Sequence, residues 1–265
     1  MNAPKEEKIT VSSFRRAIAC LKGRFESEHS VIEDDSHKIC FVGDIHGDMD
    51  AIKKIERIAD SFDRIVFLGD FVDRGTSDIE VVYEISRMKS KLGDKIVILA
   101  GNHDAYSDVS PRDFDEKLAN RFGSKGKKLE QEYIEAFGNA PIAYLNEGYG
   151  LIALHGFIPA DRKDWDIGCW KKVKEDIYNS AFQVLWNDPK IIASGLRGKY
   201  MQIVDSKTIE EFFRYTRLKV IVRSHQPEIN QIFKLKSGKV VTLGSCALYG
   251  KRNIFILPEF KLVEL

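Results

Sequence analysis

Apolar and polar positions follow a strand–helix rhythm over the first hundred residues. Short apolar runs at 38–43, 64–68 and 95–100 have the length and the β-branched content of buried strands. Between these runs, residues 49–59 and 78–92 carry apolar side chains at the three- and four-residue spacing of amphipathic helices. Strands that alternate with helices are typical of a parallel sheet whose connections are right-handed crossovers. The pattern therefore predicts an α/β fold.

The second half of the chain is richer in strands and contains a hairpin. Residues 230–235 and 239–243 are predicted strands, joined by a turn at Ser237-Gly238. Further strands are expected at 150–154, 218–222 and 254–257, and further helices at 11–24 and 130–137. No repeat or Pro/Gly-rich linker divides the sequence. We therefore expect a single domain over residues 1–265, in which residues 1–35 are an N-terminal helical extension.

Composition and charge narrow the possible partners. The 265 residues include 41 basic and 40 acidic side chains, and a net charge of +1 gives no field that favours nucleic acid or an anionic membrane. The N-terminal MNAPKEEKIT lacks the apolar core of a signal peptide, and no apolar run approaches membrane-spanning length. The four cysteines lie far apart, which favours reduced thiols. We expect a cytoplasmic protein that binds neither nucleic acid nor membrane.

Ligand-type side chains follow the predicted strands. The first three strands run into Gly-Asp-Ile-His-Gly-Asp at 43–48, Gly-Asp-Phe-Val-Asp-Arg-Gly at 69–75 and Gly-Asn-His-Asp at 101–104. Four of the six histidines come directly after predicted strands, namely His46, His103, His155 and His225. A single Gly-Asp pair would be ordinary turn chemistry. Because the carboxyl ends of parallel strands border the ligand crevice of an open sheet, the recurrence predicts that these clusters converge at one site.

The residue types in these clusters suit divalent metal ions. Asp44 and His46 are two apart, so in extended backbone both side chains face the same side. Carboxylate, imidazole and amide oxygen are ligands for borderline divalent metals. Asp70 is the expected bridge, so that one ion is held by Asp44, His46 and Asp70 and the other by Asp70, Asn102, His155 and His225. Two ions about 3.5–4 Å apart would stabilise an attacking hydroxide and the phosphoryl oxygens of an in-line displacement.

The motifs GDIHG, GDFVDRG and GNHD resemble the signature of the calcineurin-like metallophosphoesterases. Later stretches narrow the resemblance to the phosphoprotein phosphatase (PPP) family of serine/threonine phosphatases, namely FGNAPIAYLNEGYGLIALHGF, LWNDP at 185–189, Arg197-Gly198, IVRSHQP and LGSCALYG. The resemblance spans about residues 38–254. It implies a fold in which mixed β-sheets form a β-sandwich flanked by α-helices, and a bare catalytic core of prokaryotic or archaeal type.

The resemblance also implies residue roles. The six metal ligands named above match the family's ligand positions. His103 matches the general acid that protonates the leaving alkoxide, and Asp73 matches the carboxylate that orients and charges this histidine. The expected phosphate-binding set is Arg74, Arg197, Asn102 and Tyr249, since a guanidinium fork binds phosphate in a bidentate manner. The implied cofactors are two divalent metal ions, with manganese as the first choice and iron or zinc as alternatives.

Departures from the family pattern surround the ligand set and leave it intact. Asp104 stands where the family has Glu, Phe157 where it commonly has Gly, and Asn187 where it has Ser. The loop before Tyr249 lacks the family's usual Pro-Asn. These changes leave the substrate groove and the regulation open. Trp186 is expected to pack in the core rather than to line a groove.

The function implied by the resemblance is dephosphorylation of phosphoserine and phosphothreonine in proteins, by direct attack of a metal-bound hydroxide. The substrates would then be phosphoproteins, and the sequence names no regulatory partner. One alternative is a small-molecule phosphoesterase such as a diadenosine tetraphosphate hydrolase, which has similar first motifs. Another is a non-catalytic scaffold, which the filled ligand positions disfavour. Residues 185–189, Arg197-Gly198 and the Tyr249 loop favour the protein phosphatase.

Overall fold

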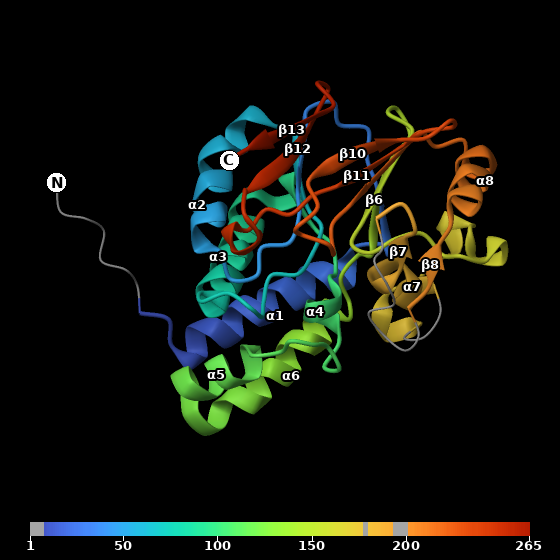
Figure 1. Ribbon diagram of the computed structural model, residues 1–265. Coiled ribbons are helices and arrows are strands. Elements are labelled where there is room, and N and C mark those ends of the chain that lie inside the picture. The colour runs from blue at the N-terminus through green and yellow to red at the C-terminus, as the bar shows by residue number, and fades with distance from the viewer. Residues whose placement is uncertain (1–7, 177–179, 193–200) are drawn as a thin grey trace.

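Two mixed β-sheets and the helices around them make up the computed structural model, which describes residues 8–176, 180–192 and 201–265 (Figure 1). The five-stranded sheet has the order β13-β12-β2-β3-β4 and is built from β2 (Ile39–Val42), β3 (Arg64–Phe67), β4 (Ile96–Ile98), β12 (Asn253–Leu257) and β13 (Lys261–Glu264). The six-stranded sheet has the order β1-β5-β6-β9-β11-β10 and is built from β1 (Val31–Glu33), β5 (Ala143–Asn146), β6 (Leu151–Leu154), β9 (Val220–Arg223), β10 (Gln231–Lys234) and β11 (Lys239–Thr242). A short pair is formed by β7 (Asp188–Pro189) and β8 (Ile203–Val204).

Helices flank both sheets. Their bounds are α1 (Val11–Ser27), α2 (Met49–Ile58), α3 (Asp78–Leu92), α4 (Asn102–Ala105), α5 (Phe114–Phe122), α6 (Gly126–Phe137), α7 (Ser180–Trp186) and α8 (Ser206–Thr216). In Figure 1, α2 and α3 lie on one side of the five-stranded sheet, whereas α7 and α8 lie by the six-stranded sheet. The predicted fold class, a sandwich of mixed sheets flanked by helices, is confirmed.

The inner faces of the two sheets share one apolar layer. Phe41 and Val66 of the five-stranded sheet pack with Tyr144 and Val222 of the six-stranded sheet, and the rings of Phe41 and Tyr144 lie 5.9 Å apart. Successive side chains of a strand point to opposite faces, so Cys40, which precedes Phe41 on β2, faces the helices. Strands that are buried on both faces give continuous apolar runs, which is what the sequence shows.

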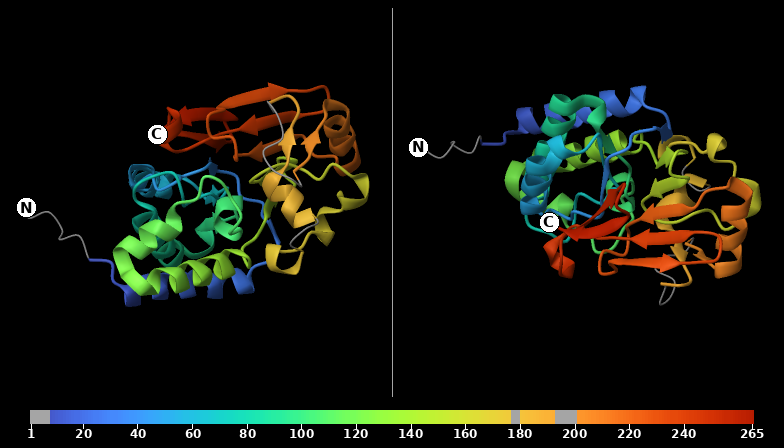
Figure 2. Two further views of the ribbon diagram at one scale, coloured as in Figure 1. Left: turned by 60° about the horizontal axis from the view of Figure 1, so that its bottom comes forward. Right: turned by 90° about the horizontal axis from the view of Figure 1, so that it is seen from above.

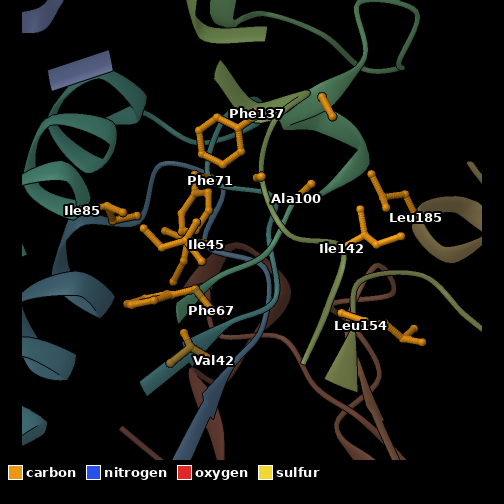
Figure 3. Close-up of a cluster of buried hydrophobic side chains, with 14 of the residues drawn as sticks. Val42, Ile45, Phe67, Phe71, Ile85, Ala100, Phe137, Ile142, Leu154 and Leu185 are labelled. Atoms are coloured by element: carbon orange, nitrogen blue, oxygen red, sulfur yellow. The ribbon is translucent and has the colours of Figure 1, made fainter. Parts of the chain in front are cut away.

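A second apolar layer lies between the five-stranded sheet and its helices. Ile45, Phe67 and Phe71 come from the ends of β2 and β3 and point toward Ile85 of α3 and Phe137 of α6 (Figure 3). The ring of Phe71 lies 5.8 Å from that of Phe67 and 5.7 Å from that of Phe137. The segments that carry the candidate ligands are thus anchored by apolar neighbours immediately beside them.

The segment expected as a helical extension belongs to the packed core. Helix α1 lies along α3 and α6 and buries Phe14, Ile18, Leu21 and Phe25 (Figure 2). After it, β1 pairs in parallel with β5 at the edge of the six-stranded sheet. The sequence did not predict β1, because three residues between polar neighbours are too short to show a period.

Strand pairing agrees with the predictions for the first three strands and for the hairpin. Strands β2, β3 and β4 are parallel, and β10 and β11 form the expected antiparallel hairpin. Strands β6 and β9 are parallel to each other but lie in the six-stranded sheet, so two sheets supply the site. Within the described part of the chain, no helix combines the length and apolar character needed to cross a membrane.

Candidate metal and phosphate site

The two sheets meet where their strands end. An isolated parallel bridge joins Asp44, just after β2, to Gly244, just after β11. The backbone N–H of His225 donates to Asp44 Oδ1 at 2.9 Å, and His155 Nδ1 lies 2.9 Å from the carbonyl oxygen of Leu68. These contacts confirm that the predicted clusters converge at one place.

The first group of ligand-type side chains consists of Asp44, His46 and Asp70. All three are buried, and their ligand atoms lie close enough together to surround one ion. His46 Nε2 is 3.7 Å from Asp44 Oδ2 and 3.7 Å from Asp70 Oδ2. The three residues are those that the sequence assigned to the first ion.

The second group shares Asp70 with the first. Asp70, His155 and His225 have ligand atoms within reach of a single ion, and His155 Nε2 is 3.4 Å from Asp70 Oδ1. Asn102 Oδ1 lies 2.9 Å from His155 Nε2 and 3.0 Å from His225 Nδ1. The structure therefore brings together all six predicted ligands, with Asp70 between the two groups.

The donor atoms suit a cation. Asp44 Oδ2 is buried and has no hydrogen-bond partner among the described residues, although a buried carboxylate oxygen is costly to leave unpaired. If His155 Nδ1–H donates to the Leu68 carbonyl, Nε2 turns a lone pair toward the oxygens of Asn102 and Asp70. Positive charge at that point, from an ion or a proton, makes this arrangement favourable. Two carboxylates, three imidazoles and an amide oxygen thus fit two divalent ions.

Buried charges shift the pKa values of these groups. Burial raises the pKa of Asp70, but the charges of His155 and His103 outweigh it and hold that pKa well below its ordinary value. Burial lowers the pKa of His155, and the Asp70 carboxylate raises it more. For His46, burial dominates and lowers the pKa. Asp70 is therefore an ionised carboxylate at neutral pH.

Left-handed backbone is concentrated at the site. Seven non-glycine residues among those described have positive φ, and five of them are in the site clusters, namely His46 (41°), Asp70 (56°), Asp73 (68°), Arg74 (67°) and His225 (68°). Such conformations cost about 1–3 kcal/mol each and persist only where the surroundings impose them. The hydrogen bonds around the clusters must therefore hold this backbone in place.

Asp104 supplies several of these hydrogen bonds. Its Oδ2 accepts the backbone N–H groups of Asp70 at 2.7 Å and Gly101 at 3.2 Å, and its Oδ1 accepts the N–H of Phe71 at 3.0 Å and the hydroxyl of Tyr133 at 2.7 Å. Burial and the neighbouring Asp70 raise the pKa of Asp104 to about 7. The backbones approach closely here, since a Cβ on Gly101 would lie 2.2 Å from the Asp70 nitrogen. The sequence did not single out Tyr133.

His103 lies between Asp73 and Arg74. Its Nδ1 is 2.7 Å from Asp73 Oδ2, and its Nε2 is 2.8 Å from Arg74 Nη2. A guanidinium can only donate, so Nε2 accepts and the imidazole carries its proton on Nδ1. Asp73 thus orients the ring as the resemblance implied, while Arg74 occupies the nitrogen that would face a leaving group.

Arg74 also reaches the first ligand group. Its Nη1 lies 3.1 Å from His46 Nε2 and 3.1 Å from the hydroxyl of Tyr249. Because an imidazole nitrogen has one lone pair, His46 Nε2 cannot accept from Arg74 and bind an ion at the same time. Ion binding therefore requires Nη1 of Arg74 to leave His46. Arg197, the other predicted phosphate ligand, lies outside the described residues.

A buried ion pair that the sequence did not predict supports the histidines of the six-stranded sheet. Arg223 Nη2 donates to Asp188 Oδ1 at 2.8 Å, and both side chains are fully buried. Arg223 Nε donates to the carbonyl oxygen of Gly156 at 2.6 Å. Arg223 thus ties the residue after His155 to the strand end that carries His225. Arg223 ends the apolar strand β9, and a charged residue at that position was the sequence feature that could have indicated a buried ion pair.

Trp186 packs against the core as predicted, but it also lines a pocket. Trp165 and Trp170 are buried, whereas Trp186 is partly exposed and lines a pocket of about 950 Å³ together with Tyr106 and Phe182. Its ring stacks on that of Phe182 at 5.6 Å and lies 6.0 Å from that of His225. The assignment to the core holds only in part, because Trp186 packs against the core cluster but ends a short helix beside the pocket.

Two packed sheets that gather aspartate and histidine side chains at their strand ends define a metallophosphoesterase architecture. Residues 37–228 match the family described as calcineurin-like phosphoesterase, and the chain belongs to this family. This match covers the strand ends that carry all six predicted ligands.

Curated relatives include serine/threonine-protein phosphatases at modest identity. Over 206 residues, the chain is 28% identical to serine/threonine-protein phosphatase PP1-1 of Saccharomyces cerevisiae, covering 75% of this chain and 65% of that protein. It is 25% identical over 252 residues to serine/threonine-protein phosphatase C23G10.1 of Caenorhabditis elegans, covering 91% of this chain and 54% of that protein. The chain thus spans between about half and two thirds of the length of these two relatives.

Solved structures share the fold at low identity. A protein serine/threonine phosphatase from Saccharomyces cerevisiae, described as similar to human phosphatase PP5, superposes with a TM-score of 0.76 at 19% identity, covering 98% of this chain and 90% of that one. A putative diadenosine tetraphosphatase superposes with a TM-score of 0.51 at 15% identity, covering 90% and 98% of the two chains. At these identities the likeness concerns the fold.

Proposed function

We propose that this chain is a metal-dependent phosphatase that removes phosphate from phosphoserine and phosphothreonine in proteins. The observation that carries the proposal is one buried aspartate, Asp70, which two ligand groups share. The hydrogen-bonded pair of His103 and Asp73, together with Arg74, lies beside it. The curated relatives carry the name serine/threonine-protein phosphatase, which supports the same substrate class.

The six predicted ligands would hold two divalent ions, on either side of Asp70. When bound, such ions supply Lewis acidity toward the phosphoryl oxygens and generate a hydroxide nucleophile at neutral pH. Manganese is the ion that we propose to test first. The protein's own residues must then bind the phosphate, orient it and deliver a proton to the leaving group.

Arg74 is the residue that connects phosphate binding to proton transfer. A substrate phosphate is a better partner for its guanidinium than an imidazole nitrogen is, because charge-assisted bonds to an anion are the stronger ones. When Arg74 turns to the phosphate, His103 Nε2 is released to face the leaving oxygen. We propose that Arg197 and Asn102 contact the same phosphate. Tyr249, whose hydroxyl accepts a hydrogen bond from Arg74, would hold the guanidinium of Arg74 in place beside that phosphate.

His103 would act as the general acid. Asp73 accepts from Nδ1 at 2.7 Å, so it stabilises a second proton on the imidazole and keeps Nε2–H aimed into the site. The alkoxide of serine is a poor leaving group and needs that proton. A positioned acid contributes about 10²–10⁴-fold to such a reaction.

The pocket beside the site favours a second candidate, a nucleotide phosphoesterase. Tyr106, Phe182 and Trp186 form an aromatic wall next to His225, and aromatic side chains stack on nucleobases. The same wall could equally take an apolar side chain of a phosphopeptide. Substrate comparison separates the two candidates.

Initial rates with added Mn²⁺ test the proposal. The panel consists of a phosphoserine peptide, a phosphothreonine peptide, a phosphotyrosine peptide and diadenosine tetraphosphate, with Asp70→Asn as the control for contaminating activity. We expect the phosphoserine and phosphothreonine peptides to have the highest kcat/KM. Higher kcat/KM on the dinucleotide, with a raised KM for it in Trp186→Ala, would replace the proposed function by the second candidate.

A further inference from the structure

A cluster of three carboxylates, next to the segment that carries Asp73 and Arg74, surrounds the ammonium group of Lys117. Asp73, Asp78 and Asp113 have oxygens close enough together to hold an ion, but Lys117 of α5 is already there. Lys117 Nζ donates to Asp78 Oδ2 at 2.9 Å and to Asp113 Oδ1 at 2.7 Å. Lys117 is therefore the cation of this cluster.

The two oxygens that Lys117 binds also hold the backbone of the catalytic segment. Asp78 Oδ2 accepts the backbone N–H of Asp73 at 2.9 Å, and Asp113 Oδ1 accepts the backbone N–H of Arg74 at 3.0 Å. Asp73 and Arg74 are the consecutive residues with φ of 68° and 67°. One ammonium group thus neutralises both acceptors that fix this left-handed pair.

The other face of the segment is held by the start of α5. Asp73 Oδ1 accepts the backbone N–H groups of Asp113 and Phe114, each at 2.9 Å, which leaves Oδ2 for His103. The backbone at the start of α5 therefore binds the Asp73 side chain. Lys117 of the same helix binds the two carboxylates, Asp78 and Asp113, that accept the backbone N–H groups of Asp73 and Arg74. In Figure 1, α5 lies at the end of the molecule opposite the strands β10, β11, β12 and β13.

We propose that Lys117 is a positioning residue for the phosphatase reaction, which holds Asp73 and Arg74 in the geometry that aims His103 at the leaving group. The inference rests on the proposed function. Among the described residues, Lys117 bonds to Asp78 and Asp113, neither of which is a predicted metal or phosphate ligand, so it would act through these two carboxylates.

Loss of the ammonium would release the segment. Asp78 is fully buried, its Oδ1 has no partner among the described residues, and Lys117 is its cationic partner. A buried carboxylate without its counter-charge protonates or turns toward water. If the carboxylate turns toward water, the N–H of Asp73 loses its acceptor, and if it protonates, the neutral oxygen accepts more weakly. In either case Asp73 is held less firmly against the ring of His103.

The matched variants are Lys117→Met, which keeps the apolar stem, and Arg121→Met one turn further along α5. Arg121 also joins α5 to α3, through Glu80 at 3.6 Å, and within the described part of the chain it forms no ion pair with Asp78 or Asp113. Lys117→Arg tests whether a second cation can hold both carboxylates. Lys117→Met combined with Asp78→Asn tests whether removing the stranded charge restores the geometry, since an amide oxygen can still accept the N–H of Asp73.

Two measurements test whether Lys117 positions Asp73 and Arg74. The first is kcat on a phosphoserine peptide compared with p-nitrophenyl phosphate, whose leaving group hardly needs a proton. The second is amide hydrogen exchange of the segment 70–77, which needs neither metal nor substrate. We expect Lys117→Met to lose about 10–100-fold in kcat on the peptide, as supporting residues of such sites do, and less on the aryl ester. We also expect faster exchange at Asp73 and Arg74, partial recovery in Lys117→Arg and in the double variant, and little change in Arg121→Met.

Equal losses on both substrates, unchanged exchange of the segment, or the same changes in Arg121→Met would overturn the inference. A wild-type protein that ignores phosphopeptides but hydrolyses aryl phosphates would contradict the proposed function alone. In that case the role of Lys117 is tested by measuring kcat on a series of aryl phosphates whose leaving groups have rising pKa. Amide hydrogen exchange of the segment 70–77 tests it independently.

Discussion

The two sheets contribute unequal halves of the candidate site. The five-stranded sheet supplies both carboxylates of the ligand groups and the two segments that carry His103 and the pair Asp73 and Arg74. The six-stranded sheet supplies two histidines, His155 and His225. Under the proposed function, proton transfer would depend on the five-stranded sheet, while the six-stranded sheet would complete the ligand set. Changes in the two halves should therefore fail in different ways.

Support for the side chains differs in the same manner. In the five-stranded half, the carboxylates of Asp78, Asp104 and Asp113 accept backbone N–H groups of left-handed residues. In the six-stranded half, the buried pair of Arg223 and Asp188 ties the strand ends together. The first arrangement fixes individual peptide groups, whereas the second fixes the spacing of two strands.

The largest effect is expected at the residue that both ligand groups share. Asp70→Asn removes the charge that faces both groups, so we expect loss of bound metal and of nearly all turnover while the fold is retained. Metal analysis of the purified protein, activity and circular dichroism measure the three quantities. Two bound ions with normal turnover in this variant would contradict the bridging role.

The next effect tests proton delivery from the five-stranded half. His103→Asn should keep its metal but lose about 10²–10⁴-fold on a phosphoserine peptide, and far less on p-nitrophenyl phosphate. Asp73→Asn should show the same preference in milder form, because it removes the partner of Nδ1. If His103→Asn loses metal, or slows both substrates equally, His103 is a ligand or a structural residue.

A substitution in the six-stranded half should be recoverable. His225→Gln leaves the acid and the arginine in place, so we expect metal affinity to fall by at least about 10–100-fold, the range already seen when only a supporting partner is removed. Activity should return as Mn²⁺ is raised, whereas Asp70→Asn should not recover. The exposed His37→Gln is the control. Failure to recover at saturating Mn²⁺ would remove the distinction between the halves.

The smallest effect concerns the hydroxyl that Asp104 accepts. Tyr133→Phe leaves the three backbone N–H donors to Asp104 in place, so we expect a loss of about 1–2 kcal/mol in the free energy of unfolding. Denaturant titration measures it, with Tyr83→Phe on α3 as the control. A loss no larger than that of the control would show that Tyr133 contributes packing alone.

The sequence was most informative where function lies in contiguous residues at strand ends. Three parallel strands end at one edge, so the clusters at 43–48, 69–75 and 101–104 had to meet, and they do. Assignment of β6 and β9 to a separate sheet could not be predicted, because a strand buried on both faces has the same apolar pattern in either sheet. The roles of the gathered residues stay predictions.

Residues that support the site from other elements were missed. Tyr133 reaches Asp104 from α6, Lys117 reaches Asp78 from α5, and Asp188 reaches Arg223 across 35 positions. Each contact depends on how two elements pack, which local periodicity does not specify. The same limit explains Trp186, whose place at a pocket rim depends on the position of α7 against Tyr106.

Anomalous diffraction from crystals of the Mn²⁺-loaded protein would locate the ions. We expect two anomalous peaks that share the Asp70 carboxylate, one beside Asp44 and His46 and the other beside Asn102, His155 and His225. A single peak, or peaks that leave Asp70 without a metal contact, would contradict the claim that the two sheet edges form one dinuclear site.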